Sequence, residues 1–210
     1  MQPETLFEDS DLIILNKPAG MPVEFNPFGD ASLQDFVADH CGNSIRIRTG
    51  PGVVHRLDKV TSGIVVMAKK PSILKQLNAD FAQGLPLKTY HALVSGKPEP
   101  QSATLTHELE KDSLARKARA AKRKTKTSKT AVLSYETETV TSTQTLLRVH
   151  LKTGRYHQIR AQLSAVGHPV IGDTHYGGPA AARVMLHCSR LVFTHPKTGQ
   201  ETDTRCEAGF

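Results

Sequence analysis

Two short apolar runs constrain the fold of this chain more than any other feature of its sequence. Leu12–Leu15 and Ile64–Ala68 are the longest candidate core segments, and each has the length of a buried strand. No run approaches the about 18 uncharged apolar residues that indicate a membrane-spanning helix. We therefore expect a globular chain built on short strands, without membrane association.

Helical patterns lie between further strand patterns. Ser32–His40 and Arg155–Val166 carry apolar residues at helical spacing, and Pro71–Gly84 also begins with a proline and ends with a glycine. Additional strands are expected at residues 88–94, 131–135, 145–151, 184–186 and 190–193. Because strands and helices mix without a regular β-α-β order, we predict an α+β fold in one domain spanning residues 1–210.

The cysteines and the N-terminus indicate the compartment. The three cysteines, Cys41, Cys188 and Cys206, are odd in number and widely spaced, which suits a reducing environment and gives no zinc pattern. The first residues carry acids and lack the basic region of a signal peptide. We expect a cytoplasmic protein.

The positive charge of the chain is concentrated in one segment. Eight Lys and Arg and no acid lie within residues 116–129, so removing these eight from the net charge of +7 leaves −1 for the rest. A local cationic segment neutralises phosphates and releases counterions, whereas a solvated loop is the alternative. We predict a basic insertion or loop at about residues 112–130 that contacts an RNA backbone. The predicted contacts are Arg116, Lys117, Arg119, Lys122, Arg123 and Lys124.

A single carboxylate, Asp58, lies among cations in the stretch VVHRLDKVTSG, residues 53–63. It is either part of a turn salt bridge or a nucleophile with supporting groups. Glycosidase chemistry needs a second acid, which the stretch lacks. Ser62 with His55 and Asp58 lacks the nucleophile elbow of a hydrolase triad. The histidines are scattered without a metal-binding spacing, so we expect no metal.

A second cluster, residues 151–160, places Arg155 near the start of an expected helix and Arg160 further along it. An arginine at a helix N-terminus is unfavourable by about 0.3–1 kcal/mol unless it binds an anion. Tryptophan is absent and aromatic residues make up 5%, too few for a base-stacking platform. The composition favours backbone recognition and an enzyme acting on one flipped nucleotide.

Six stretches in order resemble the RluA-type pseudouridine synthases. His55-Arg56-Leu57-Asp58 with Thr61-Ser62-Gly63 matches the family signature HRLDxxTSG. The other stretches are Asn16-Lys17-Pro18 with Gly20, Lys88-x-Tyr90-x-Ala92 with Gly96, residues 153–160, residues 167–177, and Leu186-His187 with residues 194–199. The resemblance covers about residues 6–205. His55, where the related RsuA type has Gly, favours the RluA branch.

The resemblance implies a mixed, mostly antiparallel sheet with flanking helices and a central cleft holding Asp58. It implies isomerisation of uridine to pseudouridine in tRNA, large-subunit rRNA or both, without a cofactor, by a monomer. Asp58 would be the catalytic aspartate, attacking C1′ or C6 or assisting a glycal route. Arg160 would be its ion-pair partner and Tyr90 would pack on the uracil.

The remaining roles follow from the same resemblance. Arg56, with His55 and Arg155, would contact the substrate, and Leu186 would line the apolar wall of the pocket. Thr61-Ser62-Gly63 would form the turn that presents the loop.

The sequence departs from the family at Tyr156, where a small Thr or Ser is usual, and at Gln162, where His is frequent. The motifs begin near Met1, so we expect no S4-like RNA-binding domain. We hypothesise that the basic segment provides part of the RNA binding that such a domain would supply. A catalytically silent RNA-binding or ribosome-assembly factor is the alternative function, and a hydrolytic N-glycosidase is the third.

Overall fold

The fold is described from a computed structural model that covers residues 2–26, 29–48, 50–121 and 123–210. The chain divides into two compact units. Unit 1 comprises residues 1–88 and 188–209, and unit 2 comprises residues 89–187 with Phe210. The prediction of one domain over residues 1–210 stays a prediction.

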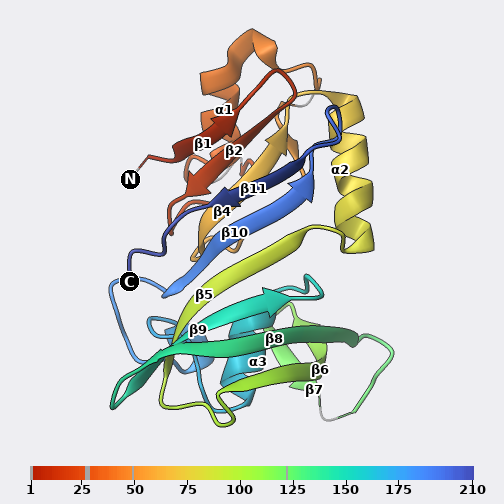
Figure 1. The fold of residues 1–210 in the computed structure, drawn as a ribbon. Helices are drawn as coiled ribbons and strands as arrows, with labels where there is room; N and C mark the ends of the chain where they lie inside the picture. Colours follow the sequence, from red (N-terminus) through yellow and green to blue (C-terminus); the bar gives the residue numbers. More distant parts are fainter. Residues whose placement is uncertain (1, 27–28, 49, 122) are drawn as a thin grey trace. The chain divides into compact units, whose positions relative to one another are not determined.

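Unit 1 is built on strands packed against two helices (Figure 1). Its first strands are β1 (Glu4–Glu8), β2 (Leu12–Lys17), β3 (Gly52–Val53) and β4 (Ser62–Ala68). They are completed by most of β10 (Leu186–Thr194) and by β11 (Glu201–Arg205). Pairing is antiparallel for β1 with β2, β2 with β4, β3 with β4 and β10 with β11. In Figure 1 the arrows of the neighbouring strands β4 and β10 point the same way, so the sheet is mixed.

The two apolar runs form the centre of unit 1, as predicted. Leu12–Leu15 on β2 and Ile64–Ala68 on β4 are fully buried and pair with each other. Such uninterrupted apolar strands are typical of a sheet covered on both faces. The strand that follows the Asp58 turn, β4, is therefore part of the core of unit 1.

Both helices of unit 1 have the ends that their sequence predicts. Helix α1 (Leu33–Cys41) begins with a capping box in which Ser32 Oγ accepts from the Asp35 N–H at 3.1 Å. Helix α2 (Pro71–Gln83) begins with Pro71 and ends at Gly84, which adopts the left-handed conformation. Leu77 on α2 is fully buried, and α2 packs against β3 and β4.

Unit 2 is an antiparallel sheet with one helix. Its strands are most of β5 (Leu87–Ser95), together with β6 (Ser102–Asp112), β7 (Lys117–Ala121), β8 (Lys129–Val140) and β9 (Gln144–Leu151). They lie in the order β5-β9-β8-β6-β7. Helix α3 (Gln158–Ala165) packs against β6 and β7, and a short 3-10 helix, η2 (Thr174–Tyr176), follows it (Figure 1). The α+β fold with a mixed, mostly antiparallel sheet and flanking helices is confirmed; the central cleft around Asp58 stays a prediction.

The segment expected as a basic insertion or loop is largely β-structure. Lys117–Ala121 forms β7, which pairs with β6, and β8 begins at Lys129. The alternation Lys-Ala-Arg-Ala explains this, because it places the small Ala118 and Ala120 on one face of the strand, toward the apolar cluster that contains Leu109. The connection from β7 to β8 contains Lys122, which lies outside the described residues.

Two further expectations differ from the structure. The helix predicted from Arg155 begins only at Gln158, because His157 takes a positive φ of 50° that ends the preceding turn. The turn predicted at Thr61-Ser62-Gly63 lies earlier, where the Thr61 N–H donates to the Asp58 carbonyl at 3.0 Å, and Ser62 already begins β4.

Candidate active site

Asp58 lies on the turn that leads into the most buried strand of unit 1. The preceding residue, Leu57, is buried at 7% exposure, whereas Asp58 is half-buried and precedes the exposed Lys59. The turn closes directly into β4, so its position is fixed by the core.

Gly63 makes the close packing of β4 in this region possible. Its φ is +115°, and a Cβ at this position would lie 2.3 Å from the carbonyl oxygen of Cys188. No side chain fits there, so the glycine lets the backbone after the Asp58 turn approach β10.

A buried ammonium group braces the Asp58 turn. Lys17 is fully buried, and its Nζ donates to the carbonyls of Pro18 at 2.9 Å, Met21 at 2.8 Å and Lys59 at 3.4 Å. The Gly20 N–H donates to the same Lys59 carbonyl at 2.7 Å. Burial lowers the pKa of Lys17 from 10.5 to about 7, and the negative charge of Asp58 opposes this shift.

Lys17 is a site residue to which the sequence assigned no role. The family resemblance includes it only as part of the stretch Asn16-Lys17-Pro18. The signal that was present is a lysine at the end of an apolar strand, directly before a proline. Its carbonyl partner at Lys59 lies 42 residues away in sequence, so no local pattern reveals the contact.

His55 has structural partners inside unit 1. Its Nε2 accepts from the Val66 N–H at 3.2 Å, and its ring stacks on Phe81 with centroids 4.9 Å apart. Burial, and secondarily the charge of Lys88, lowers the pKa of His55 to about 3. The ring is therefore neutral at physiological pH, with its proton on Nδ1, and it fixes the chain before Asp58 onto β4. Its predicted contact with substrate stays a prediction.

Arg56 is exposed and forms an ion pair with Glu24, with Nη1 and Oε2 at 2.6 Å. Exposed pairs of this kind contribute about 0–1 kcal/mol, so an incoming anion can compete for the guanidinium. The geometry leaves Arg56 available for the substrate contact that the sequence predicts.

Tyr90 and Leu186 belong to unit 2. Tyr90 lies on β5 opposite Val149 of β9 and is 6% exposed. Leu186 begins β10 and is 3% exposed. Both are placed by strands, which gives side chains a better defined direction than loops do.

Arg160 lies on the buried face of α3 and is held by Asp173. Its Nε and Nη2 donate to the two carboxylate oxygens of Asp173 at 2.6 and 2.9 Å, and both side chains are at most 5% exposed. The ring of Tyr176 lies 4.9 Å from the guanidinium carbon. Sequence reasoning assigned Asp173 no role.

The predicted pairing of Arg160 with Asp58 stays a prediction, since the two residues belong to different units.

The predicted RNA-contact residues of unit 2 differ in their surroundings. Arg116 is exposed, and its carbonyl accepts from the Tyr156 hydroxyl at 3.2 Å. Arg119 pairs with Asp112 at 2.9 Å. Lys117 lies over the Tyr176 ring, 5.8 Å from its centroid.

The connection from β7 to β8 carries the remaining predicted contacts. Arg123 and Lys124 are exposed there. Lys122 lies outside the described residues.

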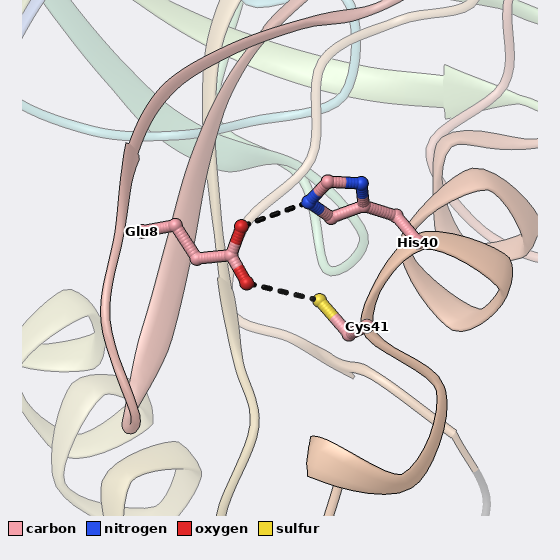
Figure 2. Close-up of side chains that lie close together, drawn as sticks. All are labelled: Glu8, His40 and Cys41. Atoms are coloured by element: carbon pink, nitrogen blue, oxygen red, sulfur yellow. Dashed lines mark hydrogen bonds and ion pairs between the residues drawn. The ribbon is translucent and has the colours of Figure 1, made fainter.

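Two clusters of metal-ligating side chains occur in the described part of unit 1. Figure 2 shows Glu8 with His40, whose Nε2 lies 2.8 Å from the carboxylate, and Cys41, whose Sγ lies 3.7 Å from it. The same carboxylate forms an ion pair with the buried ammonium of Lys69.

The second cluster is formed by Asp9, Asp11 and His195. Lys70 pairs with Asp11 at 2.6 Å. Hydrogen bonds and lysine counter-charges thus account for both clusters. In the described residues no helix is long and apolar enough to span a membrane.

The comparisons with known proteins agree with these motifs. The family model described as RNA pseudouridylate synthase matches residues 11–165. The ribosomal large subunit pseudouridine synthase D of Zymomonas mobilis is 34% identical over 97% of this chain and 68% of its own length. The tRNA pseudouridine synthase C of Vibrio cholerae is 33% identical over 94% of this chain and 87% of its own.

Solved structures show the same fold. Human RNA pseudouridylate synthase domain containing 4 superposes with a TM-score of 0.80 at 21% identity, over 97% of this chain and 88% of its own. Human RNA pseudouridylate synthase domain containing 1 gives a TM-score of 0.79, also at 21% identity, over 98% and 83%.

Proposed function

The chain belongs to the RNA pseudouridylate synthase family and is an isomerase, and we propose that Asp58 is its catalytic aspartate. The observation that carries this proposal is the HRLD stretch, which lies inside the family match and ends on a turn braced by buried Lys17. Lys17 fixes the main chain directly after Asp58, which favours one position for the loop that carries the carboxylate, and Asp58 is the only acid of its stretch.

The reaction leaves the composition of the nucleotide unchanged. The N1–C1′ bond of uridine breaks, the base rotates, and a C5–C1′ bond forms; the proton leaves C5 and N1 gains one. Asp58 attacks C1′ or C6, or assists a glycal route. No oxidant or reductant is needed, which is consistent with a reaction without a cofactor.

The other site residues have supporting roles in this proposal. Arg160, which Asp173 orients, is the proposed ion-pair partner that keeps Asp58 ionised. Tyr90 packs against the flipped uracil and Leu186 forms the apolar wall. Arg56 contacts the RNA next to the flipped base. His55 holds the chain before Asp58 against β4.

The RNA target is tRNA, large-subunit rRNA or both. The names of the two relatives point to these two classes, and the cationic segment supplies the electrostatic attraction to RNA that either class requires. We further propose a cytoplasmic monomer, consistent with three cysteines that form no disulfide.

The experiment that tests the proposal maps pseudouridines in rRNA and tRNA of a strain that lacks the gene, and of the same strain carrying the wild-type or the Asp58→Asn protein. We expect at least one site to disappear with the gene, to return with the wild type and to stay absent with Asp58→Asn. If Asp58→Asn restores the site, Asp58 is not the catalytic residue.

The same experiment separates the alternatives. A silent RNA-binding or ribosome-assembly factor predicts a growth or assembly defect with every pseudouridine retained. A hydrolytic N-glycosidase predicts release of free uracil from RNA incubated with the purified protein, whereas an isomerase releases none.

A further inference from the structure

A small pocket in unit 2 gathers three cationic side chains. Its cavity is about 210 Å³ and is lined by residues from β6, β7, β8 and the segment before α3. Lys111, Lys129 and Arg155 supply the positive charge, and the ring of Tyr156 forms part of the wall. A pocket of this size fits a phosphate group with part of its sugar.

The strand register explains why these cations converge. Lys129 on β8 lies opposite Leu109 on β6, and Lys111 lies opposite Ala118 on β7. Leu109 and Ala118 are buried, and side chains on alternate positions of a strand share a face. Both lysines therefore lie on the face of the sheet that α3 covers, next to the residues that lead into the helix.

In the part of the chain that the structure describes, the three cations of the pocket lack carboxylate partners. Within the described residues, none of them forms an ion pair with a carboxylate. Glu110 also lines the pocket, but its carboxylate accepts from the hydroxyls of Thr125 and Thr127, the latter at 3.2 Å. With three cations and one carboxylate, the lining carries a net positive charge, which favours an anionic ligand.

Two of the cations are already oriented. The Nζ of Lys111 lies 5.0 Å from the centroid of the Tyr156 ring, a cation–π geometry. The Nε of Arg155 donates to the Thr130 carbonyl at 3.0 Å, which leaves its terminal nitrogens for a ligand. Helix α3 begins at Gln158, and its positive dipole end adds to the potential there.

We propose that this pocket, formed by Lys111, Lys129, Arg155 and Tyr156, binds a phosphate of the RNA backbone away from the target uridine. The proposal rests on the proposed function, which makes RNA the ligand. Arginine and lysine around a phosphate form charge-assisted hydrogen bonds. Tyr90, the predicted uracil contact, lies on β5, three strands from β6 and thus about 14 Å away along the sheet.

Tyr156 connects two sides of the pocket. Its ring provides the aromatic face over which the Lys111 ammonium lies. Its hydroxyl also donates to the Arg116 carbonyl at 3.2 Å, which ties the turn between β6 and β7 to the segment before α3. One side chain thus orients Lys111 and fixes the segment that carries Arg155.

The test measures binding of unmodified tRNA and rRNA-fragment transcripts by fluorescence anisotropy at several salt concentrations. The pocket variant carries Lys111→Gln, Lys129→Gln and Arg155→Gln. The control variant carries Lys75→Gln, Lys97→Gln and Arg48→Gln, which removes the same charge from exposed positions outside the pocket.

We expect the pocket variant to lose about tenfold or more in affinity and its log–log salt slope to fall by about 0.7–0.9, as for one lost phosphate contact. The control should change less in both quantities. Equal losses in the two variants would show a general charge effect, and an unchanged pocket variant would show no contact; either result overturns the proposal.

A second measurement tests the phosphate site without the triple variant, whose folding could be impaired by three substitutions. Amide NMR shifts of Gly154 and Arg155 are followed during titration with inorganic phosphate, with chloride at equal ionic strength as control. The site is supported if the amide shifts change with phosphate and not with chloride. The change should be lost in the single variant Lys129→Gln and retained in Lys129→Arg. Equal shifts with chloride contradict it. Loss of pseudouridine in Asp58→Asn together with unchanged RNA affinity of the pocket variant refutes the pocket and leaves the enzyme function intact.

Discussion

Replacing Lys17 by Met tests how a buried ammonium group braces the Asp58 turn. Met has a similar length and no charge, so the packing around the fully buried side chain is largely kept. The carbonyls of Pro18, Met21 and Lys59 lose their common donor. The informative quantity is the difference in unfolding free energy between wild type and variant as a function of pH.

The magnitude follows from the pKa of Lys17. Its value falls from 10.5 in the unfolded chain to about 7 in the folded protein. Between these values the unfolded chain binds more protons, so the stability of the wild type rises with pH relative to the variant. At 1.36 kcal/mol per pH unit, the gain from pH 7 to 9.5 is about 3 kcal/mol, and the full shift corresponds to on the order of 5 kcal/mol.

Urea unfolding followed by circular dichroism at pH values from 6.5 to 9.5 measures this difference. Lys97→Met, at an exposed lysine, is the control and should show no such trend. A flat difference between wild type and Lys17→Met over this range would refute the reasoning. It would mean that the three carbonyls stabilise the ammonium form enough to cancel the effect of burial.

Three further predictions concern the turn, the buried pair and the basic segment. Gly63→Ala should destabilise unit 1 by about 3 kcal/mol or more, because the new Cβ meets the Cys188 carbonyl. Gly20→Ala has open space around it and should cost about 1–2 kcal/mol, which is the cost of its positive φ alone. Thermal unfolding of the two variants distinguishes these costs. Asp173→Asn should lower the free energy of unfolding by about 3–5 kcal/mol, measured with urea, because it leaves the Arg160 charge buried without its carboxylate. A smaller loss in the double variant Asp173→Asn with Arg160→Met would support this cause. A variant with four exposed cations of the basic segment changed to Gln should bind RNA more weakly and with a flatter salt dependence, and unchanged affinity would contradict an RNA contact there. The four positions are Arg116, Arg123, Lys124 and Lys126.

Most of the fold could be predicted where a segment is stabilised by its own sequence. The apolar run Leu12–Leu15, the capping box at Ser32 and the Pro71–Gly84 helix all carry local signals. The strands that were missed, such as Ser102–Asp112 and Glu201–Arg205, are polar and half-exposed. Their strand conformation comes from pairing with β8 and β10, which no local pattern reveals.

The candidate site divides in the same way. Asp58, Tyr90 and Arg160 were identified because they stand in motifs, whereas Lys17 and Asp173 had no assigned role. Both of these residues act through partners that the fold supplies. Lys17 reaches the carbonyl of Lys59, and Asp173 reaches a side chain that lies on α3.

Lys17 and Arg160, the second of which Asp173 binds, impose the same physical requirement on the fold. A buried charge is costly unless it is bonded, so Lys17 and Arg160 are stable only where carbonyls or a carboxylate fix them. That requirement also fixes the carbonyl of Lys59, directly after Asp58, and the orientation of the Arg160 guanidinium. In unit 1 the bonds of Lys17 therefore fix the main chain next to Asp58, and in unit 2 Asp173 fixes the proposed catalytic Arg160 itself. The rigidity that catalysis needs arises here from the solvation requirement of charges placed inside the protein.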